Sequence, residues 1–592
     1  MVIPATVSDF YNHIILPFTV YSDKENINIL TTLLAAHGIR HAVVCPGSRN
    51  APIVHNLNEH PHIVCHPVTD ERSAGFYALG IAQATGQAVA VCVTSGTALL
   101  NLAPAAAEAM YQHLPVIIIS ADRPQQWIGQ LDGQTLPQHG ALGTFVRRAV
   151  DLPEPHNDEE RWFCNRLVNE ALAAATHRRG APVQINVRIS EPLFCFDTTE
   201  LPEERVFHVF DNKGGHSSAF DRLAERFARA ERPLIVFGQT AHDLVEEKTW
   251  QRLSEVCVVW GEPLSNPTAR TIHFDEAVHL VTSDRFTPEE RTALCPDYIV
   301  YIGDTLVSKR ARRFLRTAKA ESCLVTPDAT DMADPLMSLT AVVECPTPDI
   351  ARLLGLLANT ANDSQNRKTF KQRWQHLLSC CDTHAETYRP AYSQMATVQY
   401  FEQQLEDLDH TFHLHYANSS AIRLANIYAA HYVWCNRGVN GIEGSLSTAA
   451  GFSLATDDFV VCVIGDLSFF YDQNALWNQG LRGNLRILLL NNSGGSIFRQ
   501  LPGLDRSPAA HHLIGAAHHT SAQGICAQND IGYLAARNTE EMHIGIVTLL
   551  TRQATRPMVL EVFTDGEQDV QVMKDYYNSI LDYAKPKRME KD

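Results

Sequence analysis

The stretch FVVCVIGDLSFFYDQNALWNQGLRGNLRILLLNNSG, residues 459–494, decides the fold. Its two ends, 459–464 and 485–490, are continuous apolar runs of strand length, which are typical of strands buried on both faces of a parallel sheet. We expect a helix through Asn474–Gln479 to connect them. Asp466 and Asn492 should then lie at the carboxyl ends of neighbouring strands, where parallel sheets bind ligands.

The first third of the chain repeats this alternation. Apolar runs at 41–45, 63–68, 88–93 and 116–120 alternate with helical patterns at 27–37 and 70–85 and with one long alanine-rich helix after the turn 94–97. The segments 96–122 and 465–491 are equally long, and each runs from one strand end, over a helix, to the next strand end. We therefore predict two related α/β domains.

Strand-like runs at 233–238, 298–303 and 322–327 predict a third α/β domain between them. The predicted fold is thus α/β, with three domains that each contain a mainly parallel sheet flanked by helices. We expect the domains to span 1–198, 199–358 and 396–592, with a linker and helix at 359–395. The polar stretch 359–368 has the composition of a linker, and the charged residues before Asp592 resemble a frayed tail.

Composition excludes several classes of protein. The 592 residues carry a formal charge of −17, which repels nucleic acids and anionic membranes. No apolar run approaches the roughly 18 residues of a membrane span, and residues 1–18 lack the basic region of a secretory signal. The 14 cysteines include no CxxC pair, which is typical of reduced thiols. We expect a cytoplasmic protein without nucleic-acid or membrane partners.

Two groups of polar residues suggest metal sites. Asp466, Asn492 and the main-chain carbonyl of Gly494 are hard oxygen ligands that suit Mg²⁺, although a helix cap and an Asn-Gly turn would explain the same spacing. The doubled histidines at 511–512 and 518–519 could also suggest a metal site. A loop or surface role is favoured for them, because no Cys, Asp or Glu lies between the pairs.

The first of these groups resembles a known motif. Gly465-Asp466-Leu467, followed after 23 residues by Asn491-Asn492, is similar to the metal–diphosphate motif of thiamine-diphosphate enzymes, which usually begins Gly-Asp-Gly. Leu467 departs from that form in the way that one branch does, the 2-succinyl-5-enolpyruvyl-6-hydroxy-3-cyclohexene-1-carboxylate synthases of menaquinone biosynthesis. Further stretches similar to this branch are Pro46-Gly47-Ser48-Arg49, Asp70-Glu71-Arg72, Thr94-Ser95-Gly96-Thr97, Ala121-Asp122-Arg123-Pro124, Asn436-Arg437-Gly438, Gly441-Ile442-Glu443-Gly444 and Ser447-Thr448-Ala449-Ala450-Gly451.

The resemblance implies a transferase that forms a carbon–carbon bond. Such an enzyme uses thiamine diphosphate with Mg²⁺ or Mn²⁺ to decarboxylate 2-oxoglutarate, releases CO2, and adds the succinyl semialdehyde carbanion equivalent to isochorismate. The first domain would bind the pyrimidine ring and the last domain the diphosphate, in a homodimer or homotetramer with sites at the subunit interface. The residues implied for the cofactor are Glu71, Gly465, Asp466, Leu467, Asn492, Gly494, Ile442 and Ser419, with Asp466, Asn492 and Gly494 holding the metal.

The resemblance implies a particular role for each of two of these residues, Glu71 and Ile442. Glu71 would be catalytic, because it matches the glutamate that protonates the aminopyrimidine ring so that the cofactor can lose its C2 proton. Taken alone, a Glu in the first turn of a helix is more often a surface residue. Ile442 matches the apolar residue that keeps the two cofactor rings bent, although an Ile is otherwise a core residue.

Both implied substrates carry two carboxylates, so the pocket must be basic. The resemblance places Ser48, Arg49, Arg123, Gln134, Lys309, Arg310, Arg423 and Arg437 in it. Guanidinium groups suit bidentate binding of carboxylates. Each arginine could instead form a surface ion pair, Lys309 and Arg310 could belong to a solvated helix face, and Gly133 departs from the family pattern beside Gln134.

Two other functions remain open at this point. The chain could be another thiamine-diphosphate-dependent 2-oxo acid decarboxylase or carboligase, which a screen of 2-oxo acids would distinguish. It could also be a non-catalytic relative that only binds the cofactor, but cofactor binding alone would not need Glu71.

Overall fold

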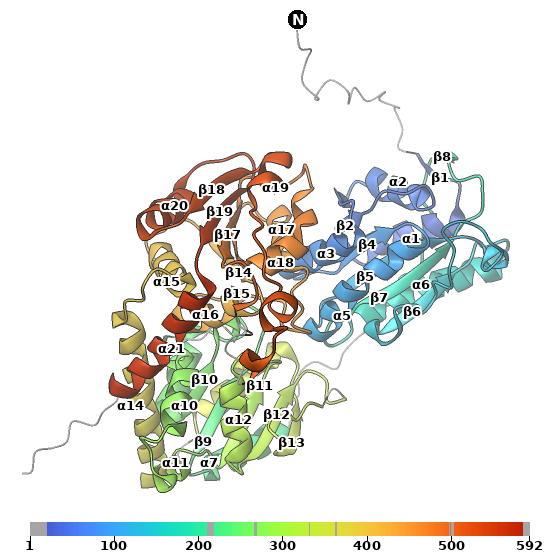
Figure 1. Ribbon diagram of the computed structural model, residues 1–592. Helices are drawn as coiled ribbons and strands as arrows, with labels where there is room; N and C mark the ends of the chain where they lie inside the picture. The colour runs from blue at the N-terminus through green and yellow to red at the C-terminus, as the bar shows by residue number, and fades with distance from the viewer. Residues whose placement is uncertain are drawn as a thin grey trace, which may run out of the picture.

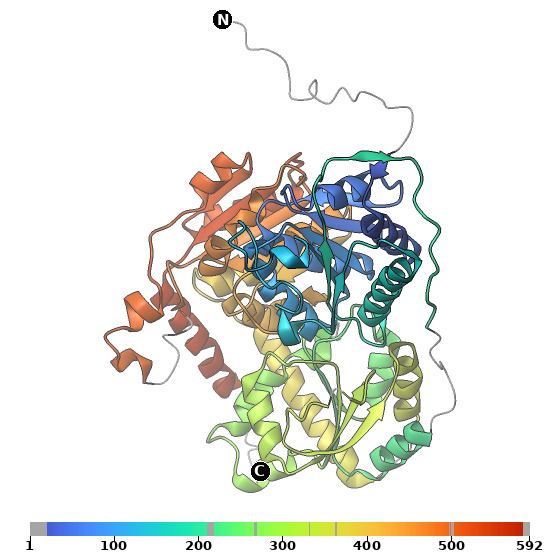
Figure 2. The ribbon, with the colours of Figure 1, turned by 90° about the vertical axis from the view of Figure 1, so that its right-hand side faces the viewer.

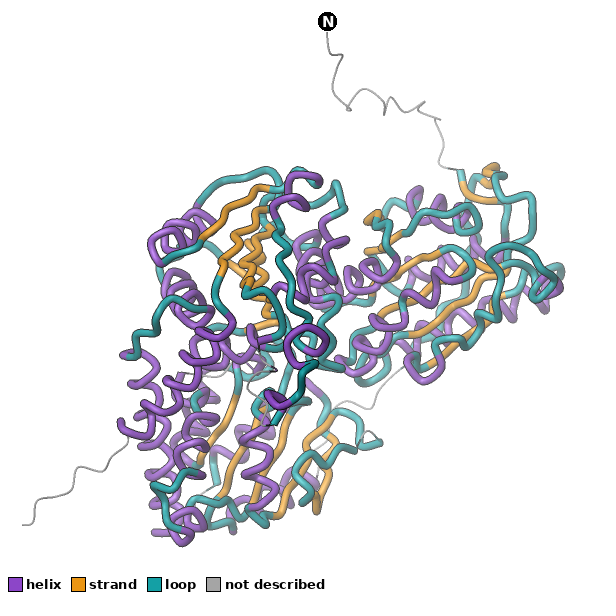
Figure 3. Tube along the Cα trace, viewed as in Figure 1, coloured by secondary structure: helices purple, strands orange, loops and turns teal. Residues whose placement is uncertain are grey.

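The computed structural model describes residues 20–209, 218–265, 269–330, 332–360, 364–496, 498 and 503–583. Three parallel sheets flanked by helices form three α/β units, as predicted (Figures 1 and 3). Residues 199–209 connect the first unit to the middle one along the outside of the molecule (Figure 2). Within the described part of the chain, no helix is both long and apolar enough to cross a membrane. The exact domain boundaries remain predictions.

The first sheet has the strand order β3-β2-β4-β5-β7-β6, with every pair parallel. Its strands are β2 (His41–Val44), β3 (Val64–Pro67), β4 (Val89–Val93), β5 (Val116–Asp122), β6 (Arg148–Leu152) and β7 (Val183–Arg188), and its main helices are α1 (Glu25–Ala36), α2 (Ala51–Glu59), α3 (Glu71–Thr85) and α6 (Asp158–Thr176). A short antiparallel pair, β1 (Tyr21–Ser22) with β8 (Phe196–Thr198), lies at one end.

The alanine-rich helix predicted after the turn 94–97 is wrong in one respect, because the structure has two helices there. They are α4 (Thr97–Asn101) and α5 (Ala103–Gln112), and the break falls at Leu102. Pro104 explains the break: it has no N–H to donate to the preceding turn and its ring crowds that turn, so it is tolerated only near the start of a new helix.

The last sheet has the order β15-β14-β16-β17-β19-β18, again with every pair parallel. Its strands are β14 (Phe412–Tyr416), β15 (Val433–Trp434), β16 (Phe459–Gly465), β17 (Leu485–Asn491), β18 (Gly532–Ala536) and β19 (Met558–Phe563), and its main helices are α15 (Gln394–Leu405), α16 (Ser420–Tyr428), α17 (Ser445–Leu454), α20 (Thr539–Thr551) and α21 (Gly566–Tyr583). β16 and β17 are neighbours, as predicted, with Gly465 opposite Leu490.

The helix predicted through Asn474–Gln479 is wrong. Instead, α18 (Asp466–Tyr471) begins directly at the strand end, and a 3-10 turn at Gln473–Leu476 follows it. The buried Asp472 explains the difference, because its carboxylate accepts hydrogen bonds from the backbone N–H and the hydroxyl of Ser447, both at 2.7 Å. The chain must leave the helix there to bring this carboxylate to the start of α17.

The middle sheet has the order β10-β9-β11-β12-β13. Its strands are β9 (Pro233–Phe237), β10 (Val258–Gly261), β11 (Tyr298–Ile302), β12 (Glu321–Thr326) and β13 (Leu339–Glu344). The linker predicted at 359–368 is only partly correct: residues 361–363 lie outside the described residues, but α14 (Gln365–Thr387) already begins at Gln365, with Ser364 as its cap. The predicted tail before Asp592 lies outside the described residues as well.

α14 joins the middle and last domains (Figure 1). The ring of Trp374 on this helix lies 5.0 Å from that of Trp260 in the middle domain, and the ring of His384 lies 4.9 Å from that of Tyr576 on α21. One hydrophobic core therefore continues from the middle domain into the last.

The first and last domains meet where α3 crosses α17. A Cβ atom added to Gly80 would lie 1.9 Å from the carbonyl oxygen of Thr448, and one added to Gly451 would lie 2.2 Å from that of Tyr77. The two helix backbones are therefore so close that neither Gly80 nor Gly451 has room for a side chain. Tyr77 adds a hydrogen bond from its hydroxyl to the carbonyl of Ala475, at 2.6 Å.

We predict that Gly80→Ala destabilises the protein, because even one methyl group must push α3 away from α17. Overpacking of this kind costs about 1–3 kcal/mol, which should lower the melting temperature in calorimetry. Gly355→Ala in α13 (Ile350–Ala358) is the matched control, since nothing lies within 4 Å of its added Cβ. It should gain about 0.5–1 kcal/mol in helix stability. Equal melting temperatures for the two variants would contradict the prediction.

Candidate functional site

Asp466 is the first residue of α18 and lies at the carboxyl end of β16. It is 4% exposed, and its two oxygens accept hydrogen bonds from the backbone N–H groups of Leu467 (2.7 Å) and Gly494 (2.9 Å). Among the described residues, no Lys or Arg forms an ion pair with it. Nε2 of His518 lies 3.2 Å from Oδ2. A buried carboxylate without a permanently charged partner is costly, so this position favours a bound cation.

The amide of Asn492 has a defined orientation. Its nitrogen donates to Ser496 Oγ and to Asp569 Oδ2 on α21, both at 2.8 Å. Because both N–H groups have acceptors, Oδ1 is the atom of this amide that is left for a metal. Asp569 was not predicted as a site residue, since it lies far along the chain in no recognisable motif.

Gly494 lies in a turn that only glycine fits. Its φ is 147°, and an added Cβ would lie 2.8 Å from the carbonyl oxygen of Gly515. Its carbonyl accepts a hydrogen bond from Ser496 at 3.0 Å, which leaves one lone pair for a further partner. Together, the Asp466 carboxylate, Asn492 Oδ1 and the Gly494 carbonyl fit a divalent cation with oxygen ligands. Gly465 and Leu467 lie on either side of Asp466 and are both half-buried. No atom lies within 4 Å of a Cβ added to Gly465.

Two arginines of the last domain, Arg423 and Arg437, form no ion pair with a carboxylate among the residues that the structure describes. Arg423 is on α16, and Arg437 follows β15. Burial lowers the pKa of Arg423, and the charge of Arg437 lowers it further. Arg437 donates to Asn418 Oδ1 at 3.1 Å, but its buried Nε has no hydrogen-bond partner among the described residues. Two adjacent guanidinium groups are suited to an anion such as a carboxylate.

Asn418 holds the backbone around this arginine pair. Its amide donates to the carbonyls of Asn436 (2.6 Å) and Gly441 (2.7 Å), and so ties the end of β14 to the segment 436–441. Ser419 follows with a φ of 77° and begins α16. Sequence reasoning missed Asn418, although a polar residue directly after a buried strand is a signal for such a role.

The middle domain contributes a basic group to the same region. Arg310, on α12 (Lys309–Thr317), forms an ion pair with Asp275 and stacks over the ring of Tyr577 at 4.5 Å. Asp275 and Tyr577 also influence Arg423 electrostatically, so Arg310 and Arg423 share one environment. Lys309 is exposed beside them.

A buried carboxylate, Glu262, fixes the start of α12 against α16. It accepts hydrogen bonds from the N–H groups of Val307 (2.7 Å) and Ser308 (2.8 Å) and from the amide of Asn426 on α16 (3.1 Å). Burial raises the pKa of Glu262 to about 7. Sequence reasoning also missed this residue, and its only signal is a charge that directly follows the buried strand β10.

The predicted basic residues of the first domain have carboxylate neighbours. Arg49 is buried and lies 3.1 Å from Glu191, while Arg123 lies 3.7 Å from both Glu191 and Asp132. Ser48 and Gln134 are exposed. Within the described ranges, no hydrogen bond or ion pair joins these first-domain residues to Arg423 or Arg437.

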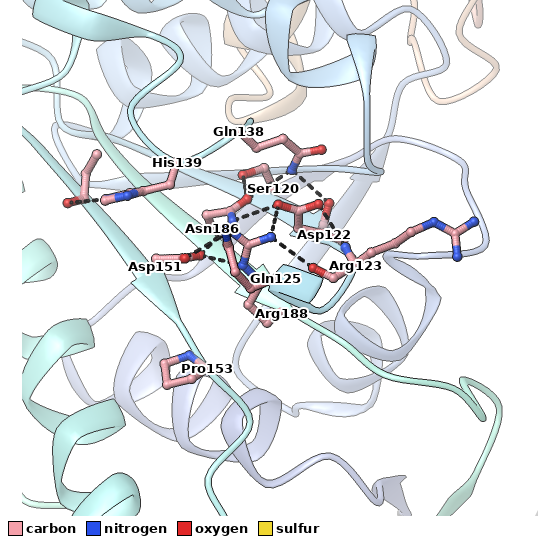
Figure 4. A network of polar contacts seen from close by, with 12 residues as sticks. Ser120, Asp122, Arg123, Gln125, Gln138, His139, Asp151, Pro153, Asn186 and Arg188 are labelled. Atoms are coloured by element: carbon pink, nitrogen blue, oxygen red, sulfur yellow. Dashed lines mark hydrogen bonds and ion pairs between the residues drawn. The ribbon is translucent and has the colours of Figure 1, made fainter. Parts of the chain in front are cut away.

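A buried polar network holds the loop that carries Arg123 and Gln134 (Figure 4). Arg188 at the end of β7 uses all five of its donors: it binds Asp122, both oxygens of Asp151, the carbonyl of Arg123 and the side chain of Gln125, at 2.7 to 3.0 Å. A second branch runs through Gln138, which donates to Asn186 (2.9 Å) and accepts from the N–H of Gly96 (2.6 Å). Both ends of the loop are therefore anchored.

Glu71 is the first residue of α3 and is half-buried. Its neighbours touch the segment that follows Asp466 in the same chain: Asp70 accepts from Asn474 at 2.8 Å, and Arg72 donates to the carbonyl of Tyr471 at 2.9 Å. Burial raises the pKa of the Cys45 thiol, and the nearby Glu71 charge raises it further.

Ile442 lies in a segment of the last domain that the first domain holds. The buried Glu108 on α5 accepts hydrogen bonds from the N–H groups of Gly438 and Val439, both at 2.7 Å. Ile442 itself is 41% exposed, which is unusual for an isoleucine in an ordered loop. This apolar side chain is therefore accessible to a ligand or to a further surface.

Comparison with known proteins gives consistent results. A family profile described as "Thiamine pyrophosphate enzyme, N-terminal TPP binding domain" matches residues 27–143. The 2-succinyl-5-enolpyruvyl-6-hydroxy-3-cyclohexene-1-carboxylate synthase of Bacteroides thetaiotaomicron is 43% identical, covering 95% of this chain and 100% of its own. The Porphyromonas gingivalis enzyme of that name is 33% identical, covering 96% of this chain and 99% of its own.

Similar folds occur among solved structures, and one of them covers most of this chain. It belongs to a Mycobacterium smegmatis protein that has been assigned as a thiamin diphosphate-dependent enzyme, with a TM-score of 0.66, 17% identity and coverage of 92% of this chain and 100% of that one. At this identity the similarity supports the fold alone.

We predict that Asp466→Ala abolishes Mg²⁺-dependent binding of thiamine diphosphate while the protein stays folded. The substitution removes the only carboxylate of the proposed metal site and fills no core. Calorimetric titration with thiamine diphosphate and Mg²⁺ measures the loss. The control is Asp457→Ala, whose exposed carboxylate lies before the opposite end of the same strand and pairs with Arg482. Wild-type affinity in Asp466→Ala would mean that this residue only caps α18.

Proposed function

The chain belongs to the family of 2-succinyl-5-enolpyruvyl-6-hydroxy-3-cyclohexene-1-carboxylate synthases, and we propose that it carries out their reaction. It is a thiamine-diphosphate-dependent transferase of menaquinone biosynthesis. It decarboxylates 2-oxoglutarate and adds the succinyl semialdehyde carbanion equivalent to isochorismate. The observation that carries the substrate assignment is the Arg423–Arg437 pair, two adjacent guanidinium groups that form no ion pair with a carboxylate among the described residues.

The last domain supplies the residues for the diphosphate end of the cofactor. We propose that Asp466, Asn492 and Gly494 hold Mg²⁺ or Mn²⁺, and that Gly465, Leu467 and Ser419 line the adjoining surface. When bound, thiamine diphosphate would supply a nucleophilic carbon toward the 2-oxo group and a cationic thiazolium ring as the electron sink for decarboxylation. Ile442 gives the cofactor an apolar contact, and Glu71 exchanges a proton with the aminopyrimidine ring.

The substrate pocket combines residues of all three domains in this proposal. Its cationic members are Arg49, Arg123, Lys309, Arg310, Arg423 and Arg437, and its uncharged polar members are Ser48 and Gln134. Arg423 and Arg437 should contribute most, because carboxylates already compete for Arg49, Arg123 and Arg310.

We further propose a homodimer in which the first domain of one chain completes the site of the other, or a tetramer built from such dimers. Exposed apolar side chains near the proposed site residues support this arrangement: Val439 is 48% exposed, Trp127 50%, and Leu131 is fully exposed. A cytoplasmic location is proposed from the cysteines, all 14 of which are free thiols.

One assay tests the function. The protein is mixed with thiamine diphosphate, Mg²⁺, 2-oxoglutarate and isochorismate, and the products are identified by mass spectrometry. We expect the adduct and one CO2 per turnover. Succinic semialdehyde without adduct would instead indicate a 2-oxo acid decarboxylase, and no product would indicate a relative that only binds the cofactor.

Glu71→Gln should retain cofactor binding and lose turnover by about 100-fold or more, because an amide cannot exchange a proton with the pyrimidine ring. The direct measurement is hydrogen–deuterium exchange at C2 of the bound cofactor. Unchanged exchange in the variant would exclude Glu71 from the mechanism.

Arg423→Ala and Arg437→Ala should each lower kcat/KM by about 10- to 100-fold, the value of one charge-assisted hydrogen bond. The affinity for thiamine diphosphate should change little, since the arginines are assigned to substrate carboxylates. Arg482→Ala, which removes a surface ion pair with Asp457, is the control. Parallel losses of cofactor and substrate binding would point to structural damage instead.

Complementation tests the shared site. A dimer of one Glu71→Ala chain and one Asp466→Ala chain contains one intact site if each site combines two chains, and none if each site lies within one chain. Random mixing should then restore about a quarter of the wild-type sites, because half of the dimers are mixed and each has one good site. Different affinity tags allow the mixed dimer to be purified. Parental activity in the purified mixed dimer would refute the shared site.

A further inference from the structure

His518 lies next to the proposed metal site, where one backbone contact and two ring contacts hold it. Its backbone N–H donates to the carbonyl of Ser493 at 3.1 Å, and its Nδ1 accepts from the N–H of Thr520 at 3.0 Å. The ring meets that of Phe470 on α18 edge-on, with the centroids 5.4 Å apart. Its orientation is therefore set by the protein alone.

The hydrogen bond from Thr520 determines which nitrogen of His518 carries a proton. Because Nδ1 accepts, a neutral ring has its hydrogen on Nε2. This N–H is buried and has no hydrogen-bond partner among the described residues. Leaving a buried donor unsatisfied is costly, so such a donor in a binding region indicates a missing acceptor.

Asp466 does not satisfy this donor. Nε2 of His518 lies 3.2 Å from Asp466 Oδ2, but the two groups are not aligned for a hydrogen bond, and that oxygen already accepts from Gly494 at 2.9 Å. The Nε2–H next to this proposed metal ligand therefore remains available to a further acceptor.

We propose that His518 donates its Nε2–H to a diphosphate oxygen of thiamine diphosphate. The inference rests on the proposed function, because it needs that cofactor at Asp466. It also assigns a role to one of the doubled histidines, for which the sequence favoured a loop or surface position. The neighbouring His519 is exposed and makes no such approach.

The test is the dissociation constant of thiamine diphosphate at saturating Mg²⁺, measured by calorimetry on the full-length protein. His518→Phe keeps a ring against Phe470 but has no donor, and should raise this constant about 10- to 100-fold. His518→Gln can place its amide nitrogen near the position of Nε2 and should restore most of the affinity. The control, His519→Phe, should bind like the wild type. His518→Leu repeats the loss of the donor if the phenylalanine ring prevents folding.

The outcomes separate the inference from its premise. Saturating Mg²⁺ removes any effect that acts only through metal affinity, so an unchanged dissociation constant in both His518→Phe and His518→Leu would overturn the inference alone. An equal loss in His518→Gln would also overturn it, because the ring and not the donor would then matter. Failure of the wild type to bind thiamine diphosphate would overturn the proposed function and this inference with it.

Discussion

The contact of α3 with α17 is the constraint on which the proposed site depends. The helix backbones approach so closely that Gly80 and Gly451 have no room for a side chain. A helix is rigid over this length, so fixing the crossing also fixes the helix ends. Glu71 is the first residue of α3, and Ile442 lies just before α17. The crossing therefore fixes how the first domain, which carries Glu71, is oriented on the last domain of the same chain, so the two surfaces that each chain presents to its partner in the proposed dimer keep one geometry.

An acidic protein must keep some arginines unpaired if it is to bind dianionic substrates. The chain has a formal charge of −17, yet Arg423 and Arg437 have no carboxylate partner among the described residues. The buried carboxylates nearby are engaged elsewhere. Glu262 binds the backbone N–H groups at the start of α12, and Glu108 binds those of the segment after Arg437. These carboxylates stabilise the backbone of the pocket through hydrogen bonds, and within the described part of the chain neither forms an ion pair with Arg423 or Arg437.

The sequence predicts best what depends on neighbouring residues. The strand ends at Asp466 and Asn492 follow from local apolar runs, and the α/β class follows from their alternation with helices. Asp569 and Glu262 could not be predicted, because each acts on partners distant in the chain: Asp569 on Asn492, and Glu262 on Ser308 and Asn426. The missed helix break has a local cause in Pro104, whereas the end of α18 depends on a tertiary contact of Asp472.

Alternate side chains of β17 pack into two different hydrophobic clusters, and the strand ends at the proposed site. Ile487 and Leu489 face the hydrophobic cluster shared with the first domain, whereas Leu488 and Leu490 face the one shared with the middle domain. The strand ends at Asn491, and Asn492 follows directly. Because a shift of one residue would exchange the two faces, both domain contacts oppose any slip of this strand. The same packing that joins the three domains therefore also holds the Asn492 amide, a proposed metal ligand, in register with Asp466.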